Sequence, residues 1–145
     1  MEAKEVRLGN YVSVFTGNQL AIDKCMVNSI DSEGINAYHK DGFEEEDYTE
    51  GGIWQDVYGI PLTEELLLKF GFKYYYAKNP DNGREFHTYY LTNDIFGHAT
   101  IQWDYNDKYC YLDFEGCMNS QKIKYVHTLQ NLIFALTGEE LTYAN

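Results

Sequence analysis

Short runs of alternating apolar and polar residues fill the first sixty residues, and glycine- or asparagine-containing turns separate them. A period of two places successive side chains on opposite faces of a β-strand. Such a dense series of short strands predicts a small SH3-like β-barrel or a β-meander. The runs cover residues 6–8, 11–15, 20–30, 34–39 and 53–60.

A short helix is predicted after these strands. Thr63 is a suitable N-cap, because its hydroxyl can accept a hydrogen bond from a free N–H of the first turn. Glu64 and Glu65 place negative charge at the positive end of the helix dipole. Gly71 stands where a left-handed residue commonly ends a helix, and Phe72 can then fold back onto the helix. The pattern predicts about two helical turns between Thr63 and Gly71.

The second half of the chain is predicted to form antiparallel strands followed by a helix. Runs rich in tyrosine and β-branched residues are separated by turn-forming residues, which favours hairpins. Apolar residues then recur at helical spacing until Gly138. The predicted strands cover residues 72–77, 84–92, 98–104 and 107–114. The apolar positions of the predicted helix are Val126, Leu129, Leu132, Ile133 and Leu136.

Together these elements predict an α+β fold. Residues 1–60 are expected to form a β-rich N-terminal subdomain. Residues 61–145 are expected to form a second subdomain from a helix, an antiparallel β-meander and a C-terminal helix packed on one sheet face. Because 145 residues is a length typical of one domain, we expect the two parts to form one compact unit.

The chain is strongly acidic, with 23 Asp and Glu residues against 11 Lys and Arg residues and a formal charge of −12. This balance opposes a nucleic-acid partner, since phosphate contacts require clustered cations. A basic protein partner, or solubility alone, fits the charge better. No apolar stretch has the length of a membrane span, no signal peptide is recognisable, and the three cysteines lack paired spacing. We therefore expect a cytoplasmic protein with free thiols and no membrane contact.

Tyrosine is the most suggestive residue type, with 14 copies in the chain. Tyr109 and Tyr111 share one face of a predicted strand, opposite the apolar residues beside them. Tyr75 and Tyr89, on neighbouring predicted strands, are candidates for the same face. One interpretation is a tyrosine-rich sheet face that docks a partner, because tyrosine supplies a large contact area at low entropy cost. The alternative is that tyrosine is here simply a good strand former with a polar tip.

The last predicted helix offers a second candidate for partner contact. His127 would lie in its first turn, and Asn131 would follow about one turn later on a nearby polar face. These side chains could form a binding strip on the helix surface. The alternative is ordinary exposure to solvent.

Catalytic signatures are absent from the sequence, which contains no nucleophile elbow, no phosphate-binding loop and no metalloprotease motif. We therefore expect a non-catalytic protein without a cofactor or a metal. The alternative is a metal-assisted hydrolase or nuclease that uses clustered carboxylates, such as those of residues 44–47, with the four histidines. Two of these, His87 and His98, lie on adjacent predicted strands. Such a site requires several ligands from separate elements to converge.

Three segments of the chain resemble a family of small uncharacterised proteins that is common in gut-bacterial genomes and in their phages and mobile elements. They are VRLGNYV (6–12), GIPLTEELLLKFGF (59–72) and IKYVHTLQNLIFALTGEEL (123–141). The resemblance brings no catalytic residues. It implies a cytoplasmic accessory protein, with a prophage as one source. Together with the missing catalytic motifs, it favours a binding or accessory protein that acts through protein–protein contacts.

Overall fold

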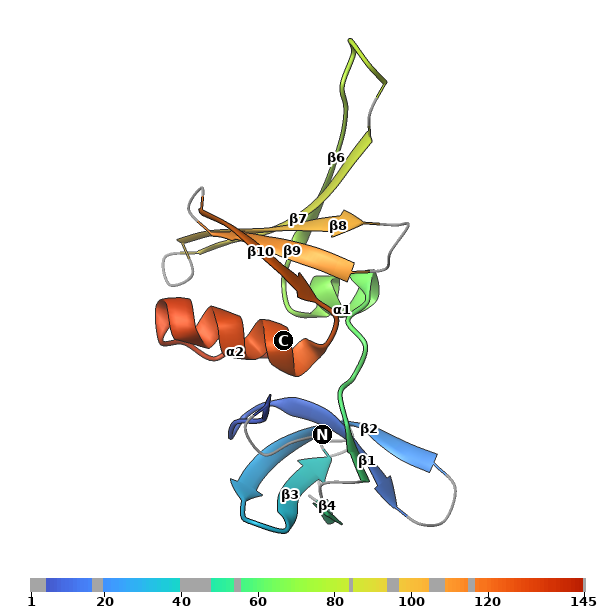
Figure 1. Ribbon diagram of the computed structural model, residues 1–145, viewed down its shortest axis with the longest axis vertical. Coiled ribbons are helices and arrows are strands. Elements are labelled where there is room, and N and C mark those ends of the chain that lie inside the picture. The colour runs from blue at the N-terminus through green and yellow to red at the C-terminus, as the bar shows by residue number, and fades with distance from the viewer. Residues whose placement is uncertain are drawn as a thin grey trace. The chain divides into compact units, whose positions relative to one another are not determined.

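The computed structural model describes residues 5–16, 20–39, 48–53, 56–83, 85–93, 97–104, 109–114 and 117–144. The chain divides into two compact units. The first contains residues 1–61 and 125–132, and the second contains residues 62–124 and 133–145. Each unit contains an antiparallel sheet, and helices are few, which agrees with the expected α+β class (Figure 1). Residues 125–132, which the sequence assigns to the second subdomain, belong to the first unit.

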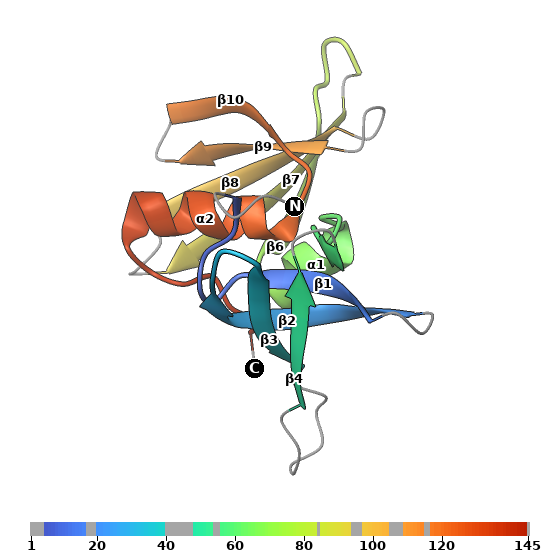
Figure 2. The ribbon, with the colours of Figure 1, turned by 60° about the horizontal axis from the view of Figure 1, so that its bottom comes forward.

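The described strands of the first unit form an antiparallel sheet in the order β4-β3-β2-β1-β5. Strands β1 to β4 follow one another as a meander (Figure 2), and β5 pairs with β1. Within the described residues this sheet is open, so the closed form of the predicted barrel is not found. The strands are β1 (Tyr11–Thr16), β2 (Leu20–Ile30), β3 (Gly34–His39), β4 (Tyr48–Ile53) and β5 (Val57–Tyr58).

Two segments of this sheet differ from the prediction. Residues 6–8 alternate like a strand, but Asn10 Oδ1 accepts a hydrogen bond from the Arg7 backbone N–H at 2.9 Å and closes a turn instead. The strand predicted over residues 53–60 is divided between the end of β4 and the short β5. Most of β4 escaped prediction because its sequence, YTEGGI, contains two glycines, which weaken a strand pattern.

A row of small and β-branched side chains forms the core of the first unit. Val12 pairs with Cys25 across β1 and β2, and Val14 pairs with Val57 across β1 and β5. Paired residues lie on the same face of an antiparallel sheet, so these side chains pack together away from water. The buried members are Val6, Val12, Val14, Cys25, Val27, Ile35, Ala37 and Val57.

Helix α2 (Val126–Thr137) begins in the first unit. Its buried positions are Val126, His127, Leu129, Gln130 and Ile133. Of the predicted apolar positions, Leu132 is half-buried and Leu136 is exposed. A polar residue takes part in the buried face because Gln130 makes hydrogen bonds to the backbone of the N-terminal segment.

The second unit contains the predicted antiparallel meander with one additional strand. Its described strands lie in the order β10-β9-β8-β7-β6. Strand β10 was not predicted, since its sequence, CMNSQKI, is largely polar and shows no alternation. The strands are β6 (Lys73–Lys78), β7 (Glu85–Asn93), β8 (Gly97–Asp104), β9 (Tyr109–Phe114) and β10 (Cys117–Ile123).

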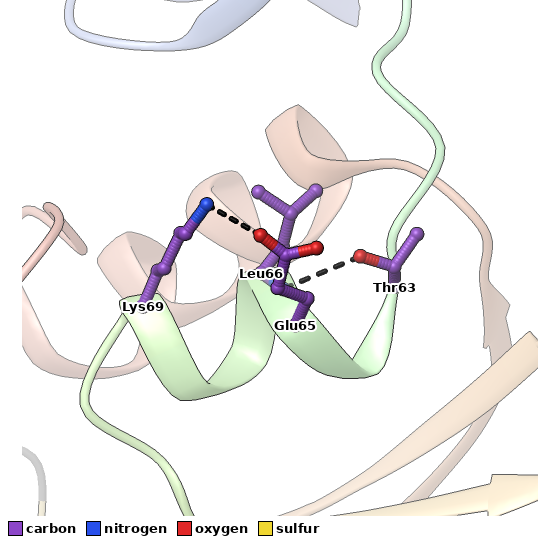
Figure 3. Close-up of polar contacts among 4 residues, drawn as sticks. All are labelled: Thr63, Glu65, Leu66 and Lys69. Atoms are coloured by element: carbon purple, nitrogen blue, oxygen red, sulfur yellow. Dashed lines mark hydrogen bonds and ion pairs between the residues drawn. The ribbon is translucent and has the colours of Figure 1, made fainter.

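Helix α1 (Glu64–Lys69) confirms the predicted caps. Thr63 Oγ1 accepts a hydrogen bond from the Leu66 backbone N–H at 3.3 Å, and Lys69 Nζ lies 2.6 Å from Glu65 Oε1 (Figure 3). At the other end, Gly71 has a φ of +87°. The Phe72 N–H donates to the Leu67 carbonyl at 3.0 Å, which is the hydrogen bond of a glycine-terminated helix.

Candidate binding site

Strand β6 is an edge strand of the second sheet and exposes three consecutive tyrosines. Tyr74 is 46% exposed, Tyr75 is 58% exposed and Tyr76 is 45% exposed. Side chains of neighbouring strand residues point to opposite faces, so both faces of β6 present aromatic rings to solvent. Large apolar rings gathered in this way on a surface are typical of interaction sites.

The exposure of β6 follows from the parts of β7 with which β6 and β8 pair. Strand β8 pairs only with Thr88–Asn93 of β7, whereas β6 pairs with β7 from Glu85 to Tyr90. Residues Glu85–His87 therefore pair with β6 alone. In Figure 1, β6 and β7 continue past the other strands of this sheet as a hairpin. We call residues 73–90 of this hairpin, apart from the undescribed residue 84, the tyrosine arm.

Side-chain and backbone hydrogen bonds hold the turn at the tip of the tyrosine arm. Asn79 Oδ1 accepts hydrogen bonds from the backbone N–H groups of Asp81 at 2.8 Å and Asn82 at 3.4 Å. The Gly83 N–H donates to the Asn79 carbonyl at 2.9 Å, and Gly83 has a φ of +69°. Asparagine and glycine suit these positions, because one caps the turn and the other tolerates the left-handed conformation.

One face of the tyrosine arm carries a row of rings. Tyr74 pairs with Tyr89 and Tyr76 pairs with His87 across β6 and β7. The ring centroids of Tyr89 and Tyr74 are 5.2 Å apart, those of Tyr74 and His87 are 6.1 Å apart, and those of His87 and Tyr76 are 5.3 Å apart. The Tyr74 hydroxyl lies 2.8 Å from His87 Nδ1. These contacts restrict the rotamers of the rings before any partner binds.

Tyr89 ties this row to the core of the second unit. It is only 2% exposed, and its hydroxyl donates a hydrogen bond to Glu64 Oε2 in the first turn of α1. A buried tyrosine hydroxyl requires such a partner. The row therefore runs from a fixed, buried ring to exposed rings farther along the arm.

A carboxylate and an ammonium group lie beyond the last ring of the row. The hydrogen bond from the Tyr76 hydroxyl lowers the pKa of Glu85, and the neighbouring Lys78 lowers it further. Lys78 Nζ is 3.3 Å from Glu85 Oε1. Partial burial raises the pKa of Tyr76, and the hydrogen bond to Glu85 and its charge raise it further. At neutral pH the tip-facing end of the row therefore has a neutral Tyr76 hydroxyl beside the ionised side chains of Glu85 and Lys78.

Tyr75 occupies the opposite face of β6, where it pairs with Thr88. Within the part of the chain that the structure describes, its side chain makes no hydrogen bond and no ring contact. It is also the most exposed of the large apolar residues there. Tyr75 is thus the ring whose contact area is most freely available to a partner.

The structure separates the tyrosines that the sequence groups together. Tyr75 is exposed as that hypothesis requires, whereas Tyr89 is buried and cannot contribute to an exposed face. Its position was ambiguous because aromatic residues occupy both faces of β7. Tyr111 is half-buried on β9, while Cys110 and Leu112 beside it are buried as predicted. The side chain of Tyr109 lies outside the described residues.

His127 does not lie on a solvent-exposed strip, since it is only 5% exposed. Its ring stacks on Tyr125 with centroids 5.7 Å apart, and within the described part of the chain its Nδ1 has no hydrogen-bond partner. Burial lowers the pKa of His127, and Glu5 opposes that shift. Helical periodicity places His127 near polar residues of the same helix. It does not reveal that the side chain of His127 faces other segments of the first unit, which bury it.

Asn131 is half-buried and already engaged. Its Oδ1 accepts a hydrogen bond from Arg7 Nε at 3.2 Å, and its Nδ2 donates to the Glu5 carbonyl at 3.0 Å. These contacts hold the N-terminal segment against α2 within the first unit. Asn131 therefore acts as a structural amide in this arrangement.

Sequence reasoning missed Tyr74 and Tyr76 as site residues and considered His87 only as a metal ligand. A signal was available, since three successive tyrosines between two lysines show no alternation of polarity. A strand without alternation is either buried on both faces or exposed on both, and lysines at its ends favour the exposed edge.

The carboxylates and histidines of the metal-site hypothesis do not converge in the described part of the chain. No group of three or more His, Cys, Asp or Glu side chains there could hold a metal ion. His98 pairs with Thr92, five residues along β7 from His87, a separation of roughly 17 Å. Residues 44–47 lie outside the described residues.

Comparisons of the chain with protein-family models, with curated proteins and with solved structures find no match. The resemblance to a gut-bacterial and phage family therefore stays a prediction. The described residues contain no helix with the length and apolar character needed to span a membrane. Functional inference for this chain rests on the geometry of the tyrosine arm.

Proposed function

We propose that this chain is a non-catalytic binding protein that captures a protein partner on its tyrosine arm. The observation that carries the proposal is the run of three exposed tyrosines on an edge strand, tied through Tyr74 and the buried Tyr89 to the core of the second unit. Tyrosine is enriched at interfaces because its ring supplies contact area and its hydroxyl supplies a hydrogen bond.

Preorganisation strengthens this proposal. The exposed rings of Tyr74 and Tyr76 contact His87, and the row they form ends at a ring fixed by Glu64. Side chains that are already ordered lose less conformational entropy on binding. The row therefore suits a binding surface better than isolated exposed tyrosines would.

An accessory role in the cytoplasm, with a phage or mobile element as the source, accompanies this proposal. It is supported by the three segments that resemble the small-protein family, and by nothing in the geometry. The metal-assisted alternative has no supporting observation within the described residues, and we do not propose it.

Capture from a lysate of the cells that produce the protein tests the proposal. Immobilised wild-type protein is compared with Tyr75→Ser, which removes an exposed ring that makes no hydrogen bond or ring contact with another described residue. Tyr58→Ser is the matched control, because Tyr58 is 52% exposed and lies on β5 of the first unit. We expect wild type and Tyr58→Ser to retain the same protein and Tyr75→Ser to lose it. Equal recovery by all three, or no recovery by wild type, would contradict the proposal.

A further inference from the structure

The charge of β6 is opposite to that of the whole chain. The chain has a formal charge of −12, yet β6 has a lysine at each end and no acidic residue. Three carboxylates of the second unit already have partners: Glu64 bonds to Tyr89, Glu65 to Lys69, and Glu85 to Tyr76 and Lys78. Among the described residues, Lys73 forms no ion pair. A partner aligned with β6 therefore meets one lysine, Lys73, that has no ion pair among the described residues, and a second, Lys78, whose charge Glu85 partly neutralises.

The free side of β6 is a template for another strand. No other described strand pairs with the outer side of β6, so alternate backbone N–H and C=O groups on that side point away from β7. Recognition by strand addition uses those groups for affinity and the side chains for selection. Five of the six residues of β6 are exposed, which leaves its side chains accessible to an added strand.

A second copy of this chain fits the β6 edge poorly. Centred antiparallel pairing of two β6 strands would set Lys73 of one copy opposite Lys78 of the other at both ends. Like charges directly opposite each other destabilise a strand pair.

We infer that the β6 edge binds an extended segment of another protein by β-strand addition, and that this segment carries acidic residues five positions apart, opposite Lys73 and Lys78. The inference rests on the proposed function and specifies the partner. Between its acidic ends the segment carries β-branched or aromatic residues, which pair well with tyrosine across strands. Whole-chain acidity favours a basic partner, but distant charges are screened beyond about 10 Å at 0.1 M salt. The charges adjacent to the added strand therefore decide the preference.

Two end-blocked hexapeptides test the inference against the full-length protein. The first is Glu-Val-Thr-Val-Thr-Glu, and the second replaces both glutamates with lysine. We expect the acidic-ended peptide to bind at least about tenfold more tightly, since two attractive cross-strand pairs replace two repulsive ones. We also expect it to slow amide hydrogen exchange at alternate residues of β6. A third peptide, Glu-Val-Thr-Pro-Thr-Glu, should lose binding because proline has no N–H to donate to a neighbouring strand.

A charge reversal supplies the matched control. Lys73→Glu should reduce or reverse the preference for the acidic-ended peptide. Lys124→Glu, at an exposed position just before α2, makes the same change in net charge and should leave the preference unaltered. Binding of the acidic-ended peptide weaker than about 1 mM, or equal binding of both peptides, would overturn the inference.

The experiments distinguish a failure of the strand-addition inference from a failure of the proposed function. If Tyr75→Ser loses the captured partner while the bound partner leaves the β6 amides unprotected, the tyrosine arm is a binding surface and strand addition is wrong. If Tyr75→Ser retains the partner, the proposed function is wrong whatever the peptides show.

Discussion

Gln130 Oε1 accepts a hydrogen bond from the Tyr11 backbone N–H at 2.8 Å, across 119 residues of sequence. The same side chain donates from Nε2 to the Gly9 carbonyl at 3.2 Å. Gln130 is fully buried, and these two hydrogen bonds satisfy its side-chain amide. The first turns of α2 thereby fasten the N-terminal segment within the first unit.

Replacing Gln130 with leucine should strongly destabilise the protein. Leucine preserves the approximate volume but removes the hydrogen bonds to the Tyr11 N–H and the Gly9 C=O. Each hydrogen bond contributes about 0.5–1.5 kcal/mol, so we expect a loss of roughly 1–3 kcal/mol. Urea denaturation measures the free energy of unfolding. Asn131→Ala, at the adjacent half-buried amide, is the control and should cost about 0.5–1.5 kcal/mol. Equal losses would contradict the special role of Gln130.

His127 should make the stability of the protein fall in mild acid. Burial lowers its pKa in the folded protein below the ordinary value of 6.5, so the unfolded chain takes up a proton more readily. The contribution of His127 to stability is thus complete above about pH 6.5 and is lost as the pH falls below it. His127→Phe retains a ring beside Tyr125 and cannot titrate. The slope of unfolding free energy between pH 5 and 7, followed by denaturation, should be shallower in this variant, and parallel curves would count against the assignment.

Cys110 should be inert toward alkylating reagents in the folded protein. Burial raises the pKa of its thiol to about 12, and Sγ lies 3.5 Å from the Ile123 carbonyl oxygen. Because only the thiolate reacts, labelling at pH 8 should be roughly a thousandfold slower than for an exposed cysteine. Mass spectrometry of peptides after timed iodoacetamide treatment measures the rate. Full-rate labelling without denaturant would show that β9 opens to solvent.

Local signals predicted α1 well, because its caps at Thr63 and Gly71 depend on neighbouring residues alone. Strand β10 escaped prediction because an edge strand with polar side chains leaves no periodic signature. The orientation of Tyr89 was also beyond the sequence, since tyrosines on both faces of β7 satisfy either choice. Its buried hydroxyl bonds to Glu64, which lies 25 residues away along the chain. Contacts between distant segments, like those of Gln130 and Asn131, have no local pattern to predict them.

The most direct test of the binding proposal is a calorimetric titration of the purified captured partner into wild-type protein, Tyr75→Ser and Tyr58→Ser. Tyrosine is enriched among the few interface residues whose removal costs more than about 1 kcal/mol, and Tyr75 is the most exposed ring of the tyrosine arm. We predict that Tyr75→Ser weakens the affinity by roughly tenfold or more and that Tyr58→Ser leaves it unchanged. Equal affinities for wild type and Tyr75→Ser would contradict the account of the tyrosine arm.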